Sequence, residues 1–292
     1  MGCRFLKKLG IYILTCLILF SVAGNADEAA LPIDFSGGMT PLEEGYIGAL
    51  EYKDESIHVR IDEKRIFNTD VWIAYIKIAH PSQLRTLSAR GFDSAQVAKG
   101  EVLSRRSNAV LTINGDYYSY ENTGYLIRQS ALYRNLPGGV RDVLLIDKQG
   151  DFHFVLAATE DALSQFDTSN IVNTFNFGPA LVMEGQRVES FIDNRNAAFK
   201  PRQRMCIAQT GPLEYMCIAT GASGRGSTGM TLEQLSIVAY DHGAIQAYNL
   251  DGGDSTMMFF QHKKVNDPNS NSTREISDIV YFASTQGQTP DK

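Results

Sequence analysis

Two apolar segments joined by a polar turn stand out in the hydrophobic pattern of the chain. Ala247 and Tyr248 precede the turn, residues 257–260 follow it, and both segments are typical of buried strands. The turn itself, residues 249–256, carries five polar side chains: Asn249, Asp251, Asp254, Ser255 and Thr256. Burying a carboxylate beside apolar strands costs free energy unless the carboxylate is paired with another group or has a functional role. Asp251 and Asp254 are therefore candidate site residues, and a plain hairpin turn is the alternative.

The glycines of this turn add a second reason to expect a site. Gly252 and Gly253 permit positive φ and close approach of the backbone to a ligand. An upstream segment has a similar pattern, because a helix ending near residue 105 leads into a buried strand, residues 109–113. That strand ends in Asn114, Gly115 and Asp116. We expect two similar helix-strand units whose polar strand ends converge on one pocket; a hairpin turn at 114–116 is the alternative.

The helix of the second unit has clear end signals. Thr231 and Gln234 have the spacing of a capping box, and Gly243 follows the last helical residue. The first helix is expected from Asp93, as its cap, to about Arg105. Strand-like segments fill most of the remaining chain, among them residues 46–52, 56–60, 71–80, 125–133, 142–147, 152–157 and 276–283.

These elements predict an α+β fold, a mixed and largely antiparallel sheet with packed helices. We expect one domain over residues 51–284, preceded by a linker or N-terminal arm over 27–50 and followed by a disordered tail over 285–292. Residues 1–26 have the layout of a signal peptide: cations, an apolar run over 11–20, then small residues. The protein is therefore expected to be secreted or extracytoplasmic, with membrane contact only through an uncleaved signal segment.

Charge limits the classes of partner. The formal net charge is −6, and removing residues 1–26 with their three cations gives 24 − 33 = −9. An acidic exported protein is a poor nucleic-acid binder, so we expect no nucleic-acid partner. Small molecules or surface glycans are the expected substrates, with any phosphate bound locally by arginine.

Two cysteines remain after the signal segment, in an expected hairpin around Gly211 and Pro212. If the hairpin pairs residues whose numbers add up to 423, Cys206 lies directly opposite Cys217. A disulfide and two buried free thiols both remain open. No His and Cys spacing indicates a zinc site.

Several motifs together resemble the phosphodiester glycosidase family. They are residues 113–118 (INGDYY), 177–181 (FGPAL), Arg204 followed by 206–208 (CIA), 229–232 (GMTL) and 249–257 (NLDGGDSTM). The resemblance covers roughly residues 70 to 283. Three positions depart from the family pattern: glycine is common where Asp116 and Asp254 stand, and Arg202 competes with Arg204 for the arginine position.

The resemblance implies cleavage of a sugar-1-phosphodiester of N-acetylglucosamine type, on an exopolysaccharide or cell-surface glycan. Its leaving group is already a stabilised anion, so phosphate binding and one carboxylate would suffice, without a cofactor. Asp251 is the expected nucleophile or base, with Asp116 second, while Arg204 and Arg225 are expected to bind phosphate. The remaining substrate-binding candidates are Asn114, Gly115, Gly178, Asn249, Gly252, Gly253, Asp254 and Ser255.

Two alternatives come from other classes. A metal-dependent phosphodiesterase would use Asp251, Asp254 and Asp116 as ligands of a divalent cation. A non-catalytic glycan-binding protein of exopolysaccharide biosynthesis would keep the cleft without needing a central carboxylate.

Overall fold

The computed structural model describes residues 30–191, 198–222, 226–267 and 274–286. The predicted signal segment 1–26, the candidate Arg225 and residues 287–292 of the predicted tail lie outside these ranges. Within them no helix is long and apolar enough to cross a membrane.

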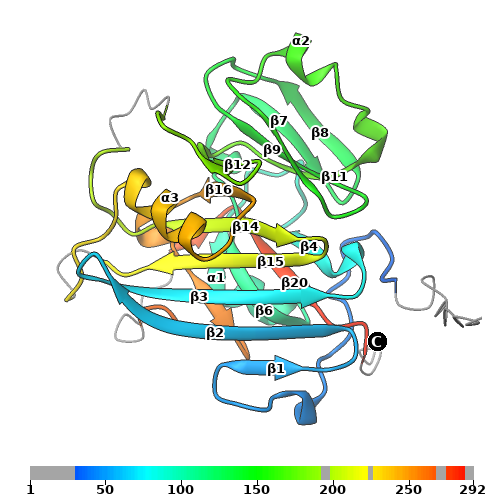
Figure 1. Ribbon diagram of the computed structural model, residues 1–292. Helices are drawn as coiled ribbons and strands as arrows, with labels where there is room; N and C mark the ends of the chain where they lie inside the picture. Colours follow the sequence, from blue (N-terminus) through cyan, green and yellow to red (C-terminus); the bar gives the residue numbers. More distant parts are fainter. Residues whose placement is uncertain (1–29, 192–197, 223–225, 268–273, 287–292) are drawn as a thin grey trace, which may run out of the picture.

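Antiparallel sheets make up most of the fold (Figure 1), so the predicted α+β class is wrong. In the described ranges the α-helices are short: α1 (Gly100–Arg106), α2 (Glu160–Leu163) and α3 (Leu232–Asp241). The helix expected from Asp93 begins only at Gly100, because strand β5 (Ala98–Lys99) occupies the residues before it. The described residues also form five single-turn 3₁₀ helices: η1 (Glu43–Gly45), η2 (Pro81–Gln83), η3 (Tyr118–Tyr120), η4 (Thr168–Asn170) and η5 (Gly253–Ser255).

The largest sheet has eight strands. In spatial order they are β1 (Glu51–Lys53), β2 (Ile57–Ile66), β3 (Thr69–Ile78), β15 (Glu214–Thr220), β14 (Met205–Gly211), β16 (Gln246–Leu250), β12 (Ala180–Met183) and β13 (Gln186–Arg187). The three strands expected in the first eighty residues are confirmed as β1, β2 and β3, with altered ends.

A five-stranded sheet packs behind the first. Its order is β18 (Lys263–Lys264), β17 (Met258–Phe260), β6 (Ala109–Asn114), β20 (Asp278–Ala283) and β4 (Leu84–Ser88). Smaller sheets complete the fold: β10 (Phe152–Val155), β9 (Val143–Asp147) and β11 (Ile171–Phe175); β19 (Glu275–Ile276) with β5; and β7 (Gly124–Arg128) with β8 (Ala131–Leu136).

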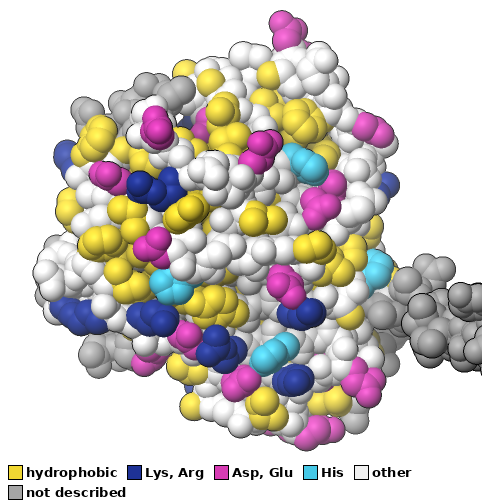
Figure 2. Space-filling view, viewed as in Figure 1, with side chains coloured by type: hydrophobic (Ala, Val, Ile, Leu, Met, Phe, Trp, Pro, Cys, Tyr) yellow, Lys and Arg dark blue, Asp and Glu magenta, His cyan; other side chains and the backbone are white. Residues whose placement is uncertain are grey.

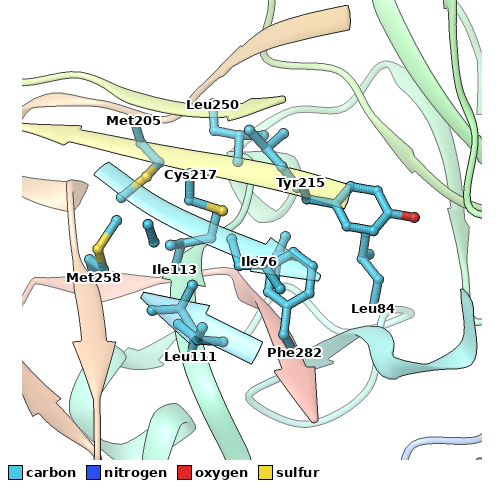
Figure 3. Close-up of a cluster of buried hydrophobic side chains, with 14 of the residues drawn as sticks. Ile76, Leu84, Leu111, Ile113, Met205, Tyr215, Cys217, Leu250, Met258 and Phe282 are labelled. Atoms are coloured by element: carbon cyan, nitrogen blue, oxygen red, sulfur yellow. The ribbon is translucent and has the colours of Figure 1, made fainter. Parts of the chain in front are cut away.

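The main core lies between the two large sheets. Figure 3 shows Ile76, Cys217 and Leu250 of the eight-stranded sheet facing Leu111 and Phe282 of the five-stranded sheet, all fully or almost fully buried. Because strand side chains alternate between faces, the opposite face of each sheet needs its own cover. Helix α3 covers the outer face of the larger sheet, and α1 covers that of the smaller one.

Helix α3 begins as its sequence predicts. The Thr231 hydroxyl accepts a hydrogen bond from the Gln234 amide at 3.1 Å, and the Gln234 side chain accepts one from the Thr231 amide at 3.0 Å. Leu235 and Val238 then face the sheet and are buried. The capping-box prediction is confirmed.

The hairpin of the two cysteines has a register one residue away from the expected one. Cys206 pairs with Ile218, and Ile207 pairs with Cys217, because the hairpin turns at Pro212 and Leu213 and a bulge lies between Gln209 and Gly211. A one-residue shift turns side chains to opposite faces of the sheet. Cys206 packs under α3 and Cys217 lies in the main core, so both are buried free thiols and the expected facing pair does not form.

The described part of the expected arm, residues 30–50, packs against the sheets. Leu31 joins the core under α1, and the buried Arg85 pairs with Asp34 at 2.7 Å.

On the molecular face in Figure 2, acidic and basic side chains are interspersed.

Candidate functional site

The loop that carries Asp251 lies at the end of β16, against the segment that enters β14. The Gly253 amide donates a hydrogen bond to the Gln203 carbonyl oxygen at 3.0 Å. A Cβ on Gly252 would lie only 2.7 Å from that same oxygen. Gly252 is therefore required for close packing, and Gly253, at φ 61°, for a left-handed backbone.

Asp251 is half-buried in this loop, and its carboxyl has a shifted pKa. Burial raises the pKa of Asp251 to about 6, and the charge of Asp116 adds to the rise. The Ser255 hydroxyl, the positive charge of Arg274 and the Gly252 amide oppose it. Burial outweighs these groups, so Asp251 changes charge just below neutral pH. Ser255 itself is buried and acts on Asp251 from within the loop.

Asn114 connects the two large sheets behind this loop. Its side-chain amide donates to the Asp251 carbonyl oxygen at 2.8 Å and to the Gly115 carbonyl oxygen at 3.1 Å. Its side-chain oxygen accepts from the Met257 amide at 3.1 Å. The two helix-strand units thus lie in different sheets, with β6 in one and β16 in the other, and their polar ends do meet. Asn114 is buried and holds the main chain of Asp251 in place.

Asp116 belongs to a buried ionic cluster beside the loop. It pairs with the fully buried Arg128 at 3.2 Å, and Arg128 also pairs with Asp278 at 3.0 Å. The second oxygen of Asp116 accepts from the Asn176 amide at 3.0 Å. Gly115 fits here because a Cβ would collide with the Asp278 carboxylate. Asp116 does not line the cleft that contains Asp251.

Asn249 and Gly178 form another wall of the site. The Asn249 side-chain amide donates to the Gly178 carbonyl oxygen at 2.7 Å, and its main-chain amide donates to the Pro179 carbonyl oxygen at 3.0 Å. The Gly178–Pro179 peptide bond is cis and lies between β11 and β12, which belong to different sheets. These bonds fix the backbone of the Gly-Pro segment against β16.

Arg204 is buried at the start of β14. Its guanidinium donates to the carbonyl oxygens of Met230 at 3.1 Å and Lys200 at 3.0 Å. These bonds orient the side chain, which also lines the cleft.

A cleft of about 680 Å³ brings many of the predicted residues together. Of the sequence candidates, its lining includes Gly178, Arg204, Asn249, Asp251, Gly252, Gly253 and Asp254. Asn114, Gly115 and Ser255 lie buried outside its lining, and Asp116 lines a smaller neighbouring hollow. Arg225 falls outside the described residues.

Three further arginines line the cleft: Arg141, Arg202 and Arg274. Arg141 pairs with Glu121 at 2.7 Å. The sequence motifs indicate Arg202 only as a competitor of Arg204, and they do not indicate Arg141 or Arg274, because neither lies in a recognisable motif. In the described part of the chain, no group of three or more His, Cys, Asp or Glu side chains is arranged to hold a metal ion.

Comparison with known proteins agrees with the resemblance. The family model NAGPA, phosphodiester glycosidase, matches residues 107–283. None of the curated proteins compared with the chain matches it.

Solved structures share the fold at low sequence identity. The catalytic domain of zebrafish N-acetylglucosamine-1-phosphodiester alpha-N-acetylglucosaminidase, auto-inhibited by its pro-peptide, has a TM-score of 0.62 at 16% identity, over 85% of this chain and 87% of that chain. A hypothetical protein from Synechocystis has a TM-score of 0.61 at 14% identity, over 78% of this chain and 62% of that chain. Since the family model spans more than half of the sequence and includes the Asp251 loop, this chain belongs to the phosphodiester glycosidase family.

Proposed function

We propose that the protein is a hydrolase that cleaves the glycosidic bond of a sugar-1-phosphodiester of N-acetylglucosamine type. The observation that carries the proposal is the cleft itself, which places the half-buried carboxyl of Asp251 among arginines. A carboxylate next to cations suits a substrate with a reactive carbon beside a phosphate.

The phosphate is bound by arginines in this proposal. Arg202 and Arg274 line the cleft, and the charge of Arg274 acts on the carboxyl of Asp251. Arg204 is oriented by the carbonyl oxygens of Lys200 and Met230, so it supplies a fixed positive charge at the cleft wall. Guanidinium groups match the phosphate oxygens and stabilise the charge that grows there as the leaving group departs.

The reaction breaks the bond between the anomeric carbon and the phosphate oxygen. The electron pair of that bond leaves with the phosphate, and water supplies the hydroxyl of the released sugar. Asp251 either attacks the anomeric carbon or takes a proton from the attacking water. Both roles require the carboxylate form, which predominates above the pKa of about 6.

Asp116 and Asn114 have supporting roles in this scheme. Asp116 is engaged by Arg128, Tyr118 and Asn176 and does not line the cleft, so it acts on Asp251 through its charge, which raises the pKa of that carboxyl. Asn114 holds the Asp251 main chain. Asn249, Gly178, Gly252 and Asp254 remain candidates for substrate contacts at the cleft wall.

The substrate is proposed to be an exopolysaccharide or cell-surface glycan, because residues 1–26 have the pattern of an export signal. The protein then acts outside the cytoplasm.

In the decisive experiment, the purified protein is incubated with a synthetic N-acetylglucosamine-1-phosphodiester, with and without chelator. The products are then identified. Free sugar and a phosphomonoester are expected in both conditions. Asp251→Asn should lower kcat by about 10³-fold or more, the range seen when a catalytic carboxylate is removed. Asp161→Asn, an exposed carboxylate on α2, is the matched control and should keep full activity.

The alternatives give different results. Release of sugar phosphate that stops with chelator would indicate a metal-dependent phosphodiesterase, and glycan binding without turnover by the wild-type protein would indicate a binding protein. Full activity of Asp251→Asn would exclude the assignment of the carboxylate.

A further inference from the structure

A second, smaller hollow opens beside the cleft, and we call it the side pocket. Its volume is about 40 Å³. Five residues line both spaces: Glu121, Thr123, Val140, Arg141 and Phe177. None of the Asp251 loop, Arg202, Arg204 or Arg274 lines the side pocket. It therefore adjoins the cleft along these five residues.

The charged side chains around the side pocket are already engaged within the protein. Arg134 donates to the Tyr118 and Thr123 carbonyl oxygens at 3.2 and 3.0 Å. Arg141 pairs with Glu121 at 2.7 Å, and Asp116 pairs with Arg128 at 3.2 Å. A ligand that needed their hydrogen bonds would have to break these contacts.

Asn176 is engaged in the same way. Its side-chain oxygen accepts from the Tyr125 amide at 2.8 Å, and its side-chain amide donates to the Tyr125 carbonyl oxygen at 2.7 Å. Apolar side chains make up much of the remaining lining: Tyr117, Pro137, Val140, Val143, Ala158 and Phe177. The side pocket thus offers apolar contact more than hydrogen bonding.

Its size limits what it can hold. A cavity needs about 10–15 Å³ to hold one water-sized group, and the side pocket has about 40 Å³. It therefore accepts roughly three non-hydrogen atoms. A sugar ring is too large. We propose that the side pocket binds a short acyl or alkyl substituent of the phosphodiester substrate, while the cleft binds the phosphate and the ring attacked at its anomeric carbon.

This inference rests on the proposed function for the identity of the substrate, and it adds a determinant of specificity to it. The substituent can belong to the sugar or to the group beyond the phosphate, because the side pocket adjoins the cleft and the cleft binds the phosphate between them. Burying two or three methyl or methylene groups favours the substituted substrate by about 10-fold or more.

Gly138 offers a way to block the side pocket. It lines the pocket at an ordinary φ, and an added Cβ would meet Val140 Cγ2 at 3.7 Å and Thr123 Oγ1 at 3.8 Å. Gly138→Val therefore places methyl groups between two lining side chains without backbone strain. Gly48→Val is the matched control, since Gly48 is also exposed, and a Cβ there would meet Glu51 Cβ at 3.5 Å, far along the chain from the side pocket. Tyr117→Ala is the second test variant, because it removes an apolar wall.

The experiment uses two pairs of phosphodiesters. In the first pair, the sugar carries an acetamido group in one member and a hydroxyl group in the other. In the second pair, the group beyond the phosphate is propyl in one member and methyl in the other. For each pair, the ratio of kcat/KM is measured, together with the ratio of calorimetric Kd values in the Asp251→Asn background. Wild-type protein should prefer the substituted member of one pair by about 10-fold or more, and the preferred pair identifies the source of the substituent.

Gly138→Val and Tyr117→Ala should reduce that preference to near unity, and Gly48→Val should leave it unchanged. Equal losses for both members of each pair, or an unchanged preference, would overturn the proposal, as would a wild-type protein without preference in either pair. Preferential binding without any turnover would contradict the hydrolase function but support the side pocket.

Discussion

At the scale of single residues, burial determines the charge states that matter. Asp251 and Asp278 are both carboxyls whose pKa is raised chiefly by burial. They differ in surroundings: Asp251 lines the cleft, while Asp278 lies fully buried behind it against Arg128. The first is suited to chemistry near neutral pH, and the second belongs to the support of the site.

The activity should therefore depend on pH through Asp251. If its carboxylate is the reactive form, kcat/KM should be half-maximal near pH 6, should approach a constant value above about pH 7 and should fall about tenfold per unit well below pH 6, because the pKa is about 6. The measurement is a pH–rate profile from pH 4.5 to 8.5 at constant ionic strength. A flat profile through pH 6, or a rate that increases as pH falls, would contradict this role.

The stability of the fold should depend on pH through Asp278. Burial, together with the charge of Asp116, raises the pKa of Asp278 to about 8 against the opposing charge of Arg128. A raised carboxyl pKa means that the native state binds more protons than the unfolded state between the two pKa values. This group then favours the native state most at low pH, and its contribution is lost as pH rises toward 8.

Asp278→Asn removes that titration. Relative to wild type, the free energy of unfolding of the variant should increase between pH 4 and 8 by on the order of a few kcal/mol. Urea unfolding at several pH values measures the difference, with Asp161→Asn as an exposed control. Parallel curves for wild type and Asp278→Asn would show that Asp278 does not titrate in this range.

At the scale of elements, the site depends on how closely the Asp251 loop packs on the entry to β14. Three contacts hold the loop: the hydrogen bond of the Gly253 amide, the hydrogen bond from Asn114 of β6, and the close backbone approach at Gly252. The contacts of Gly252 and Gly253 are both made with the Gln203 carbonyl oxygen at the entry to β14, and that of Asn114 comes from the end of β6. The position of the Asp251 carboxyl therefore depends on the relative placement of β6, β14 and β16.

Gly252→Ala should disturb this packing. Its Cβ would lie 2.7 Å from the Gln203 carbonyl oxygen, so the loop must shift, at an expected loss of about 1–3 kcal/mol in stability and at least about tenfold in kcat/KM. Thermal unfolding and steady-state kinetics measure both effects. Gly48→Ala, where the nearest contact would be 3.5 Å, should change neither, and an active, stable Gly252→Ala protein would show that the close contact is unimportant.

At the scale of the whole molecule, two antiparallel sheets enclose one main core, and the site lies where their strand ends meet. The core contains Cys217, and the outer face under α3 contains Cys206, so the sheet itself separates the two thiols. Burial raises the pKa of Cys206 to about 12, which keeps it protonated and unreactive.

The fold should therefore be independent of reductant. In a chain without residues 1–26, Cys206 and Cys217 should react with a thiol reagent only after unfolding, and Tm should be the same with and without reductant. Two reactive thiols per unfolded, unreduced chain are the expected count. Loss of those thiols, or a Tm that falls with reductant, would indicate a disulfide that this register does not permit.

The sequence by itself determined the local features of this protein: the strands β1 to β3, the capping box of α3, the polar turn with Asp251, and the family motifs. These depend on neighbours along the chain, through alternation, capping and glycine geometry. Only the tertiary structure decided the β-rich class, the one-residue shift at the cysteines, the separation of Asp116 from the cleft, and the placement of Arg141, Arg202 and Arg274. The reason is physical: sheet pairing, bulges and the meeting of strand ends depend on residues far apart in sequence, and no local pattern encodes which of them come together.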